Sequence, residues 1–426
     1  MINRFINFIK NAHTSFQSVT LSKDELVKNG FTELELSTSW NIQKGGKYFV
    51  TKSDASIIAF CIGSRLENPS IQIVASHNDS PMFKIKPNGI VTNPNFTKFN
   101  TEVYGGPIYS TWLDRPLGIS GRVTIKENDI IKTQNIELNT TVIIPNLPIH
   151  LNREMNSGFA YNPQVDLQAL LSLEPTNIYE MLKKDLGIDN VLDYDLYLYN
   201  KEEPRVVGAK NEMISAPRLD NLECHFASLE AFIEANNEDN INMWVSFDHE
   251  EVGSNSNHAA GSTFLIDVID EVLYKLNLHT NRLNILNNTM TISADNAHAV
   301  HPNHPEKSDN TNNVLMNKGI VIKYNSSNSY TSDGISAGIF KALCDEENVP
   351  YQVYTNRSDI RGGGTLGSIL LRSLSAISVD IGLPQLAMHS SYETAGIKDL
   401  ELMKKVLKGF YSKHLNVKNT KEITLK

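Results

Sequence analysis

Two adjacent glutamates, Glu250 and Glu251, follow the apolar segment WVSF and stand just before Gly253 and Ser254. Acidic residues are mostly exposed in proteins, so a Glu-Glu pair is ordinarily a solvated surface feature. Directly after a strand, however, one carboxylate can ligate a metal ion while its neighbour takes a proton from the water on that metal, if the backbone turns sharply. We therefore predict that Glu250 is the general base, that Glu251 is a metal ligand, and that Gly253 and Ser254 form the turn.

Other acids and histidines stand at comparable points of the chain, where an apolar run ends or a helix begins. They are His77 and Asp79 in VASHNDSP, Asp220 in PRLDN, Asp295 in TISADNAHA and His389 in PQLAMHSS. In open α/β sheets, ligands bind outside the carboxyl ends of the strands. We expect these separate segments to converge on one crevice.

Two histidines and several carboxylates, without cysteine, are typical ligands for two divalent metal ions. Zn²⁺ is the most natural choice, and Mn²⁺ or Co²⁺ also accept nitrogen and oxygen ligands. A bridging Asp220 would hold the ions roughly 3.5–4 Å apart. Each ion would have one histidine, one terminal carboxylate and a share of the bridge, which leaves room for water and substrate. Asp79 is expected behind the His77 ring, where a carboxylate fixes the tautomer of a ligand histidine.

The segments that position these residues alternate between strands and helices. Apolar runs at 70–76, 241–247, 289–294 and 376–382 predict strands covered on both faces. The spacing of Leu222, Phe226, Leu229 and Ile233 predicts a helix after Asp220. Residues 83–216 read differently, with alternating segments and turn signals that predict a β-rich insertion. The expected fold class is α/β, with a discontinuous catalytic domain over residues 1–82 and 217–426.

Composition narrows the class of protein. The chain has 426 residues and a formal charge of −9, which argues against nucleic-acid or anionic-membrane partners, because both favour a concentrated basic patch. Its three cysteines are widely separated, so neither a disulfide framework nor a thiolate zinc site is indicated. Arg4 and Lys10 interrupt the N-terminal segment before a signal-length apolar core develops. These features predict a cytoplasmic protein.

Six motifs, in this order, resemble the aspartyl aminopeptidase family of co-catalytic zinc aminopeptidases. They are ASHNDSP, RLDN, DHEEVGS, DNAHAVHPN, RSDIRGGGTLG and PQLAMHS, spread from residue 75 to residue 390. The resemblance implies one metal site of His77, Asp220 and Asp295 and another of Asp220, Glu251 and His389, with Asp79 and Glu250 as the catalytic carboxylates. It also implies a metallopeptidase core of mixed, largely parallel sheet flanked by helices, a β-rich dimerisation domain, and dimers assembled into a tetrahedral dodecamer.

The resemblance extends to substrate-binding residues. His150 matches a family histidine that reaches the active site of a partner subunit, and Lys323 matches a lysine near the pocket for an acidic substrate side chain. Arg361 is a candidate second cation at that pocket. The segment after Lys323 departs from the family pattern Asn-Gln-Arg-Tyr-Ala-Thr and reads Ser329-Tyr330-Thr331.

The function expected from these residues is removal of N-terminal Asp or Glu from peptides. A broader or neutral-residue aminopeptidase on the same site is an alternative, and so is a catalytically silent assembly protein. All five ligands and both catalytic carboxylates are present, which disfavours the silent protein. A phosphoesterase or an amidohydrolase would share only the set of metal ligands.

Overall fold

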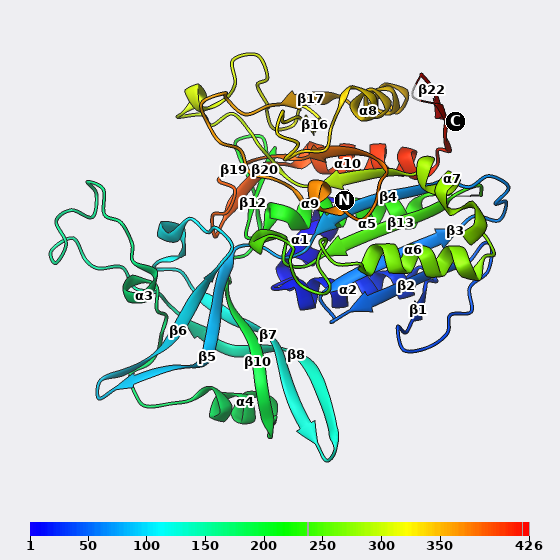
Figure 1. The fold of residues 1–426 in the computed structure, drawn as a ribbon. Coiled ribbons are helices and arrows are strands. Elements are labelled where there is room, and N and C mark those ends of the chain that lie inside the picture. The colour runs from blue at the N-terminus through cyan, green and yellow to red at the C-terminus, as the bar shows by residue number, and fades with distance from the viewer. Residues whose placement is uncertain (237, 420, 426) are drawn as a thin grey trace.

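A nine-stranded mixed sheet forms the centre of the larger lobe (Figure 1). The computed structural model describes residues 1–426 except 237, 420 and 426. In spatial order the strands are β1 (Thr32–Leu34), β2 (Lys47–Lys52), β3 (Ser56–Ile62), β13 (Ile241–Phe247), β4 (Ile71–His77), β14 (Met290–Ala294), β18 (Ile377–Gly382), β16 (Ile320–Lys323) and β17 (Tyr351–Tyr354). The four predicted strands are confirmed as β4, β13, β14 and β18. They lie side by side and run parallel.

Both faces of this sheet are buried, which is why its central strands are continuously apolar. Successive side chains of β4 alternate between two cores: Val74 lies in one, and Ile73 and Ala75 lie in the other. The first core also contains side chains of α1 (Ile2–Asn11), α2 (Ser15–Lys28), α5 (Leu219–Glu234), α8 (Gly334–Glu346) and α10 (Ile397–Tyr411). The second contains side chains of α6 (Phe264–Lys275), α7 (Arg282–Asn287) and α9 (Leu366–Leu370). The predicted α/β class is confirmed by this layering.

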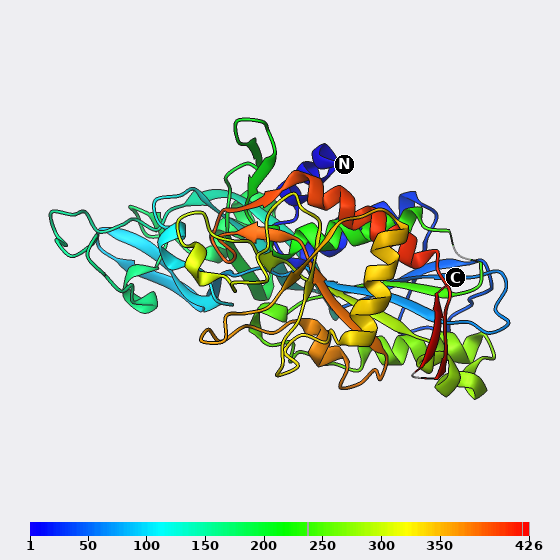
Figure 2. The same ribbon diagram turned by 90° about the horizontal axis from the view of Figure 1, so that it is seen from above.

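A separate six-stranded antiparallel sheet extends away from the larger lobe (Figure 2). In spatial order it consists of β8 (Ile130–Val142), β7 (Leu117–Glu127), β10 (Val191–Asn200), β5 (Met82–Asn93), β6 (Phe96–Tyr104) and β9 (Leu170–Ser172). The short helices α3 (Pro163–Asp166), α4 (Ile178–Leu186) and η1 (Tyr109–Trp112) accompany it. Phe83, Phe99 and Leu196 are fully buried in a hydrophobic cluster of its own. Most of the expected insertion therefore packs around a second core, which also includes Phe16 and Ala55 from the larger lobe.

A five-stranded sheet lies between these two units. It is formed by β11 (Arg205–Val207), β12 (Met213–Ala216), β20 (Glu393–Gly396), β19 (Pro384–Leu386) and β15 (Ala297–His298). Within the expected insertion, Met213–Ala216 thus pairs with β20 from the C-terminal part of the chain, and Arg205–Val207 pairs with β12. The remaining elements are η2 (Glu250–Val252), η3 (His279–Asn281), η4 (Pro305–Lys307) and the hairpin β21 (Leu415–Asn419) and β22 (Glu422–Leu425). Within the described part of the chain, none of the helices has the length and apolarity needed to cross a bilayer.

Candidate metal centre

The carboxyl ends of three neighbouring parallel strands deliver the predicted residues to one place. His77 is the last residue of β4 and is paired in register with Phe247, the last residue of β13. Asp295 directly follows β14, on the other side of β4. A sheet of this kind has its ligand crevice at that edge. The two remaining ligands come from the start of α5, which carries Asp220, and from the loop between β19 and β20, which carries His389.

The first group of ligand atoms contains His77, Asp220 and Asp295. His77 Nε2 lies 3.4 Å from Asp295 Oδ1 and 3.5 Å from Asp220 Oδ1. The opposite ring nitrogen, Nδ1, lies 3.1 Å from the main-chain oxygen of Asp79. An Nδ1–H that donates to a carbonyl leaves the Nε2 lone pair facing the carboxylates, as in a metal-ligating histidine.

The second group contains Asp220, Glu251 and His389. His389 Nε2 lies 3.5 Å from Asp220 Oδ2 and 3.3 Å from Glu251 Oε2. Its Nδ1 lies 3.1 Å from the main-chain oxygen of Gly106. This contact orients the His389 ring with Nε2 toward the carboxylates, as the Asp79 oxygen does for His77. The two oxygens of Asp220 therefore face different histidines, which is the disposition of a bridging carboxylate.

The donor set fits two divalent cations. Asp220 Oδ1 and Glu251 Oε1 are buried and accept no hydrogen bond, although unpaired buried carboxylate oxygens are costly. Burial alone would lower the pKa of His389, but Asp220 raises that pKa to about 9, so the cluster strongly favours positive charge. Nitrogen and carboxylate ligands without thiolates match the preferences of Zn²⁺, Mn²⁺ and Co²⁺.

Asp79 organises both the His77 ring and the glutamate pair. Its Oδ1 lies 3.3 Å from His77 Nδ1 and accepts the Glu250 N–H at 3.1 Å. Its Oδ2 accepts the Glu251 N–H at 3.1 Å and the Tyr104 hydroxyl at 2.7 Å. The carboxylate thus lies behind the ring, as expected, and it also fixes the turn that carries the predicted base and ligand.

The turn itself depends on left-handed backbone at its two ends. His249 has φ 63° and Gly253 has φ 93°, with the 3₁₀ turn η2 between them. Glu250 faces the cavity that also contains His77 and His389. Burial raises the pKa of Glu250 to about 8. His77 opposes this rise, and the neighbouring carboxylates add to it. A bound cation would lower that pKa again, because an opposite charge favours the carboxylate.

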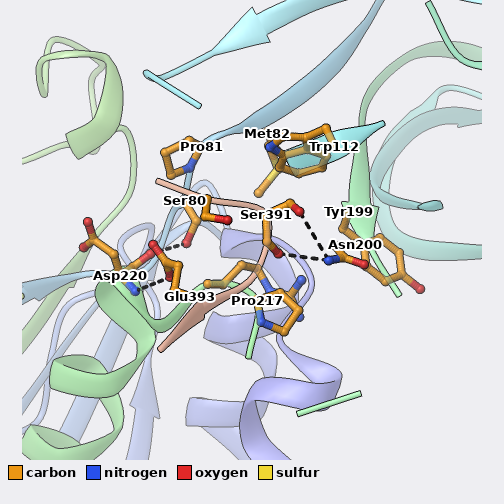
Figure 3. Close-up of a pocket in the computed structure, with 12 residues that line it drawn as sticks. Ser80, Pro81, Met82, Trp112, Tyr199, Asn200, Pro217, Asp220, Ser391 and Glu393 are labelled. Atoms are coloured by element: carbon orange, nitrogen blue, oxygen red, sulfur yellow. Dashed lines mark hydrogen bonds between the residues drawn. The ribbon is translucent and has the colours of Figure 1, made fainter. Parts of the chain in front are cut away.

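Glu393 links the start of α5, which carries Asp220, to the loop that carries His389. Its Oε2 accepts the Asp220 N–H at 3.1 Å and its Oε1 accepts the His389 N–H at 2.8 Å. The main-chain oxygen of Asp220, on the other side of that residue, accepts the Ser80 hydroxyl at 2.6 Å (Figure 3). The small cavity lined by Ser80, Asp220 and Glu393 has a volume of about 10 Å³, close to the space of one water molecule. The backbone of the bridging residue is therefore held from two sides.

Lys323 reaches the wall of the cavity that Glu250 faces, which has a volume of about 320 Å³. The side chain is 2 % exposed, and Nζ donates to the main-chain oxygens of Asp295 at 2.7 Å and Asn296 at 3.3 Å. Nζ also lies 3.5 Å from Asp295 Oδ2 and 5.2 Å from the centre of the Tyr330 ring. The ammonium group is therefore both a support for a candidate metal ligand and a positive charge at the cavity wall.

The other two predicted substrate-binding residues are not brought to this cavity within one chain. His150 is exposed in the loop that follows β8. Arg361 is exposed and lines two adjoining cavities together with Arg357, and these share Gly363 with the cavity described above. Both assignments stay predictions.

Sequence reasoning missed Tyr104 and Glu393. Tyr104 ends β6, a strand of the six-stranded sheet, and its contact with Asp79 depends on how that sheet meets the larger lobe. No local sequence pattern predicts such a contact. Glu393 had a weak signal, because it is an acid within an otherwise uncharged segment four residues after His389.

Comparisons with known proteins agree on one family. The model of the family described as aminopeptidase I zinc metalloprotease (M18) matches residues 8–411. A relative from Clostridium novyi, described as "Probable M18 family aminopeptidase 2", is 43% identical over 424 residues, covering 96% of this chain and 98% of the relative. Another with that description, from Pseudomonas aeruginosa, is 38% identical over 420 residues, covering 96% of this chain and 97% of the relative.

Solved structures share the fold. A structure of the Ape4 and Nbr1 complex superposes with a TM-score of 0.92 at 31% identity, covering 96% of this chain and 85% of that one. The mApe1 dodecamer of S. cerevisiae gives a TM-score of 0.82 at 24% identity, covering 96% of this chain and 95% of that one. The second likeness shows the fold alone.

Proposed function

The chain belongs to the M18 family of zinc aminopeptidases, and on that premise we propose that it removes N-terminal residues from peptides with a preference for Asp and Glu. The observation that supports this proposal is the pair of ligand groups that share Asp220, in one cavity with Glu250 and Lys323. In the proposal His77, Asp220 and Asp295 hold one ion, and Asp220, Glu251 and His389 hold the other. Zn²⁺ is the expected ion at both positions.

The bound ions would supply Lewis acidity that polarises the scissile carbonyl and acidifies a water molecule. Glu250 takes the proton of the attacking water and passes it to the nitrogen of the leaving amine as the C–N bond breaks. Asp79 keeps Glu250 in place through the main-chain N–H and holds the His77 ring. In this scheme Asp79 acts by positioning and Glu250 acts on the reacting atoms.

A charge count supports the proposed preference for acidic residues. The cavity lining carries four carboxylates, from Asp220, Glu250, Glu251 and Asp295, and one lysine, Lys323. Two divalent ions would bring four positive charges, so the lysine would leave the loaded cavity with an excess of positive charge. Two ammonium protons of Lys323 are used by carbonyl oxygens. An ammonium group has three donors, and the third lies near Asp295 Oδ2, at 3.5 Å, where we expect a substrate carboxylate to compete for it.

A substrate panel tests this preference. Metal-replete protein is assayed on peptides with N-terminal Asp, Glu, Leu and Lys, as wild type and as Lys323→Met. Hydrogen bonds to charged groups contribute about 1.5–3 kcal/mol, so kcat/KM for Asp and Glu should fall roughly tenfold to a hundredfold, while Leu changes little. Lys341→Met, on α8 and 5.8 Å from the Tyr324 ring, is the matched control.

Lys323 also supports Asp295, so metal content is measured on the same samples. Equal losses on all four peptides with metals retained would remove the pocket assignment and favour the neutral-residue aminopeptidase. Equal losses with metals depleted would show that Lys323 acts through Asp295 instead.

We also propose a homo-oligomer in which residues 83–216 form the dimerisation domain, with dimers assembled as a tetrahedral dodecamer. The loop around His150 supports this, because apolar side chains flank it on the surface: Leu147 is 45%, Ile149 41% and Leu151 73% exposed. Exposed apolar groups gathered in one loop are typical of interaction sites. A fold relative is itself described as a dodecamer.

His150 would complete the active site of a partner subunit. His150→Gln should lower kcat/KM on every substrate without changing the particle mass, which light scattering measures. Leu151→Asp should dissociate the particle and inactivate it while its metals remain. A fully active monomer would contradict the contribution of His150. Cytoplasmic residence is part of the same proposal and is consistent with Cys224 and Cys344 as buried thiols.

A further inference from the structure

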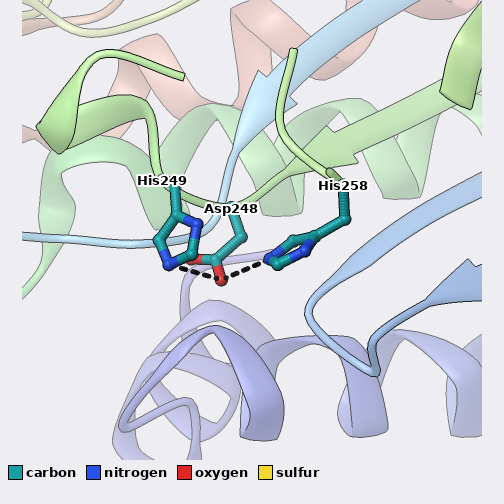
Figure 4. A group of neighbouring side chains, drawn as sticks. All are labelled: Asp248, His249 and His258. Atoms are coloured by element: carbon teal, nitrogen blue, oxygen red, sulfur yellow. Dashed lines mark hydrogen bonds and ion pairs between the residues drawn. The ribbon is translucent and has the colours of Figure 1, made fainter. Parts of the chain in front are cut away.

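A third group of metal-ligating side chains lies in the loop after β13, outside the two ligand groups described above (Figure 4). It consists of Asp248, His249 and His258, whose ligand atoms all lie within 4.8 Å of one another. Asp248 Oδ2 is 3.5 Å from His249 Nε2 and 3.3 Å from His258 Nε2. One carboxylate oxygen thus faces two imidazole nitrogens.

The loop is built so that these three side chains meet. Neighbouring residues in extended chain point to opposite sides, but the left-handed backbone of His249 turns its ring back toward Asp248. The chain then returns in a closed turn, because the Ser254 N–H donates to the His249 oxygen at 2.7 Å and the Gly261 N–H donates to the Ser254 oxygen at 3.1 Å. This return brings His258 to the other side of Asp248.

A neutral His258 ring has no proton to offer Asp248. His258 Nδ1 lies 2.8 Å from the side-chain oxygen of Asn257, which can only accept, so Nδ1 carries the proton. In a neutral ring Nε2 is then a lone pair, and it faces the Asp248 oxygen 3.3 Å away. Two acceptors at that distance repel each other unless a second ring proton or a metal cation lies between them.

A cation would also stabilise the buried negative charge of Asp248. Its side chain is 5 % exposed, and a buried carboxylate is costly unless it is paired. Among the residues that the structure describes, no lysine or arginine forms an ion pair with Asp248, whose charged contacts are with His249 and His258. The His249 side chain is 27 % exposed, which leaves one edge of the cluster open to solvent for exchange of an ion.

The separations match a tetrahedral ion. Zn²⁺ binds nitrogen and oxygen ligands at about 2.0–2.2 Å, and two ligands of a tetrahedron then lie about 3.3–3.6 Å apart. The contacts of Asp248 Oδ2 with the two rings, at 3.3 and 3.5 Å, fall in that range. We propose that Asp248, His249 and His258 bind a further divalent cation of the zinc class. The ion would cross-link the two ends of the loop that carries Glu250 and Glu251.

Metal stoichiometry tests the proposal. The full-length protein is stripped with a chelator, reloaded with Zn²⁺, freed of excess ion and analysed by mass spectrometry for zinc per chain. His258→Gln should hold one zinc per chain fewer than wild type. The matched control is His279→Gln, an exposed histidine beside Tyr274, which should equal wild type. Equal zinc contents in wild type and His258→Gln would overturn the proposal.

A second comparison separates this ion from the catalytic pair. Asp220→Asn should lose ions from the candidate catalytic centre and keep one per chain, which the further change His258→Gln removes. An Asp220→Asn protein whose residual zinc is unaffected by His258→Gln would contradict the further site, whatever the activity of the enzyme.

A crystal of the wild-type protein grown with Zn²⁺ tests the site even if His258→Gln fails to fold. The expected result is an anomalous peak about 2.0–2.2 Å from Asp248 Oδ2 and from both Nε2 atoms. Peaks between His77 and His389 without one at His258 would overturn the inference and leave the catalytic assignment intact.

Discussion

Glu393→Gln is the sharpest test of how the bridging ligand is held. One oxygen of Glu393 accepts the Asp220 N–H at 3.1 Å, and the other accepts the His389 N–H at 2.8 Å. Glutamine has the same size but only one carbonyl oxygen, so its amide group must point at one of these two N–H donors. Either the start of α5 or the loop that carries His389 is therefore expected to move.

The size of the expected loss in Zn²⁺ affinity follows from the hydrogen bond that the substitution removes. A hydrogen bond to a charged group contributes about 1.5–3 kcal/mol, which corresponds to roughly a tenfold to hundredfold change in an equilibrium constant. Glu393 touches the backbone of two candidate ligands and none of the reacting atoms, so we expect the loss mainly in metal affinity. Removing a group that orients a metal ligand typically costs about 10–100-fold in affinity.

The assay is competition for Zn²⁺ with a chelator of known affinity, followed by kcat and KM at saturating Zn²⁺. Weak binding with near-normal kcat after reloading is the expected pattern. Glu230→Gln is the control, because Glu230 is also buried but pairs with Arg4 away from the cluster. Wild-type affinity for Zn²⁺ in Glu393→Gln would show that the two backbone hydrogen bonds of Glu393 do not hold the metal ligands in place.

Three further predictions concern the bridge, the support of Asp79 and the buried core. Asp220→Asn should reduce metal content at both catalytic positions, because a neutral amide is a poor bridge between two cations; full occupancy by mass spectrometry would remove the bridging role. Tyr104→Phe deletes the 2.7 Å hydrogen bond to Asp79 and should lower kcat roughly tenfold or more with metals retained, so unchanged kcat would contradict the positioning role. Burial, and then His77, lower the pKa of His225 from 6.5 to about 3. Only the unfolded chain then binds this proton, so stability should be present above pH 6.5 and be lost as the pH falls toward 3, seen as a falling urea midpoint; a midpoint that does not fall between pH 7 and pH 5 would contradict this.

The sequence predicted the parts of the site that depend on local patterns. Long apolar runs end at His77, Asp295 and the Glu250-Glu251 pair, and parallel strands bring such ends to one edge of a sheet. Gly253 indicated the turn after β13, and its φ of 93° is a backbone angle that glycine adopts readily. These features need only the period of the side chains and the chemistry of a turn.

Contacts between distant segments could not be predicted in this way. Tyr104 and Glu393 reach the cluster because two smaller sheets meet the larger lobe, and no spacing in the sequence encodes that meeting. The support that Lys323 gives to Asp295 is of the same kind, since Lys323 ends β16 and Asp295 follows β14, and β18 lies between these two strands in the sheet. The pairing of β12 with β20 likewise depends on the finished fold.

The central claim is that Glu250 moves the proton while Glu251 holds a metal ion. Turnover and metal content, measured together on Glu250→Gln and Glu251→Gln, test this division most directly. Glu250→Gln should keep its metals and lose about 10²–10⁴-fold in kcat, the usual contribution of a general base, whereas Glu251→Gln should lose metal. Near-normal turnover in Glu250→Gln, or loss of metal in that variant with full occupancy in Glu251→Gln, would show that the two roles are assigned wrongly.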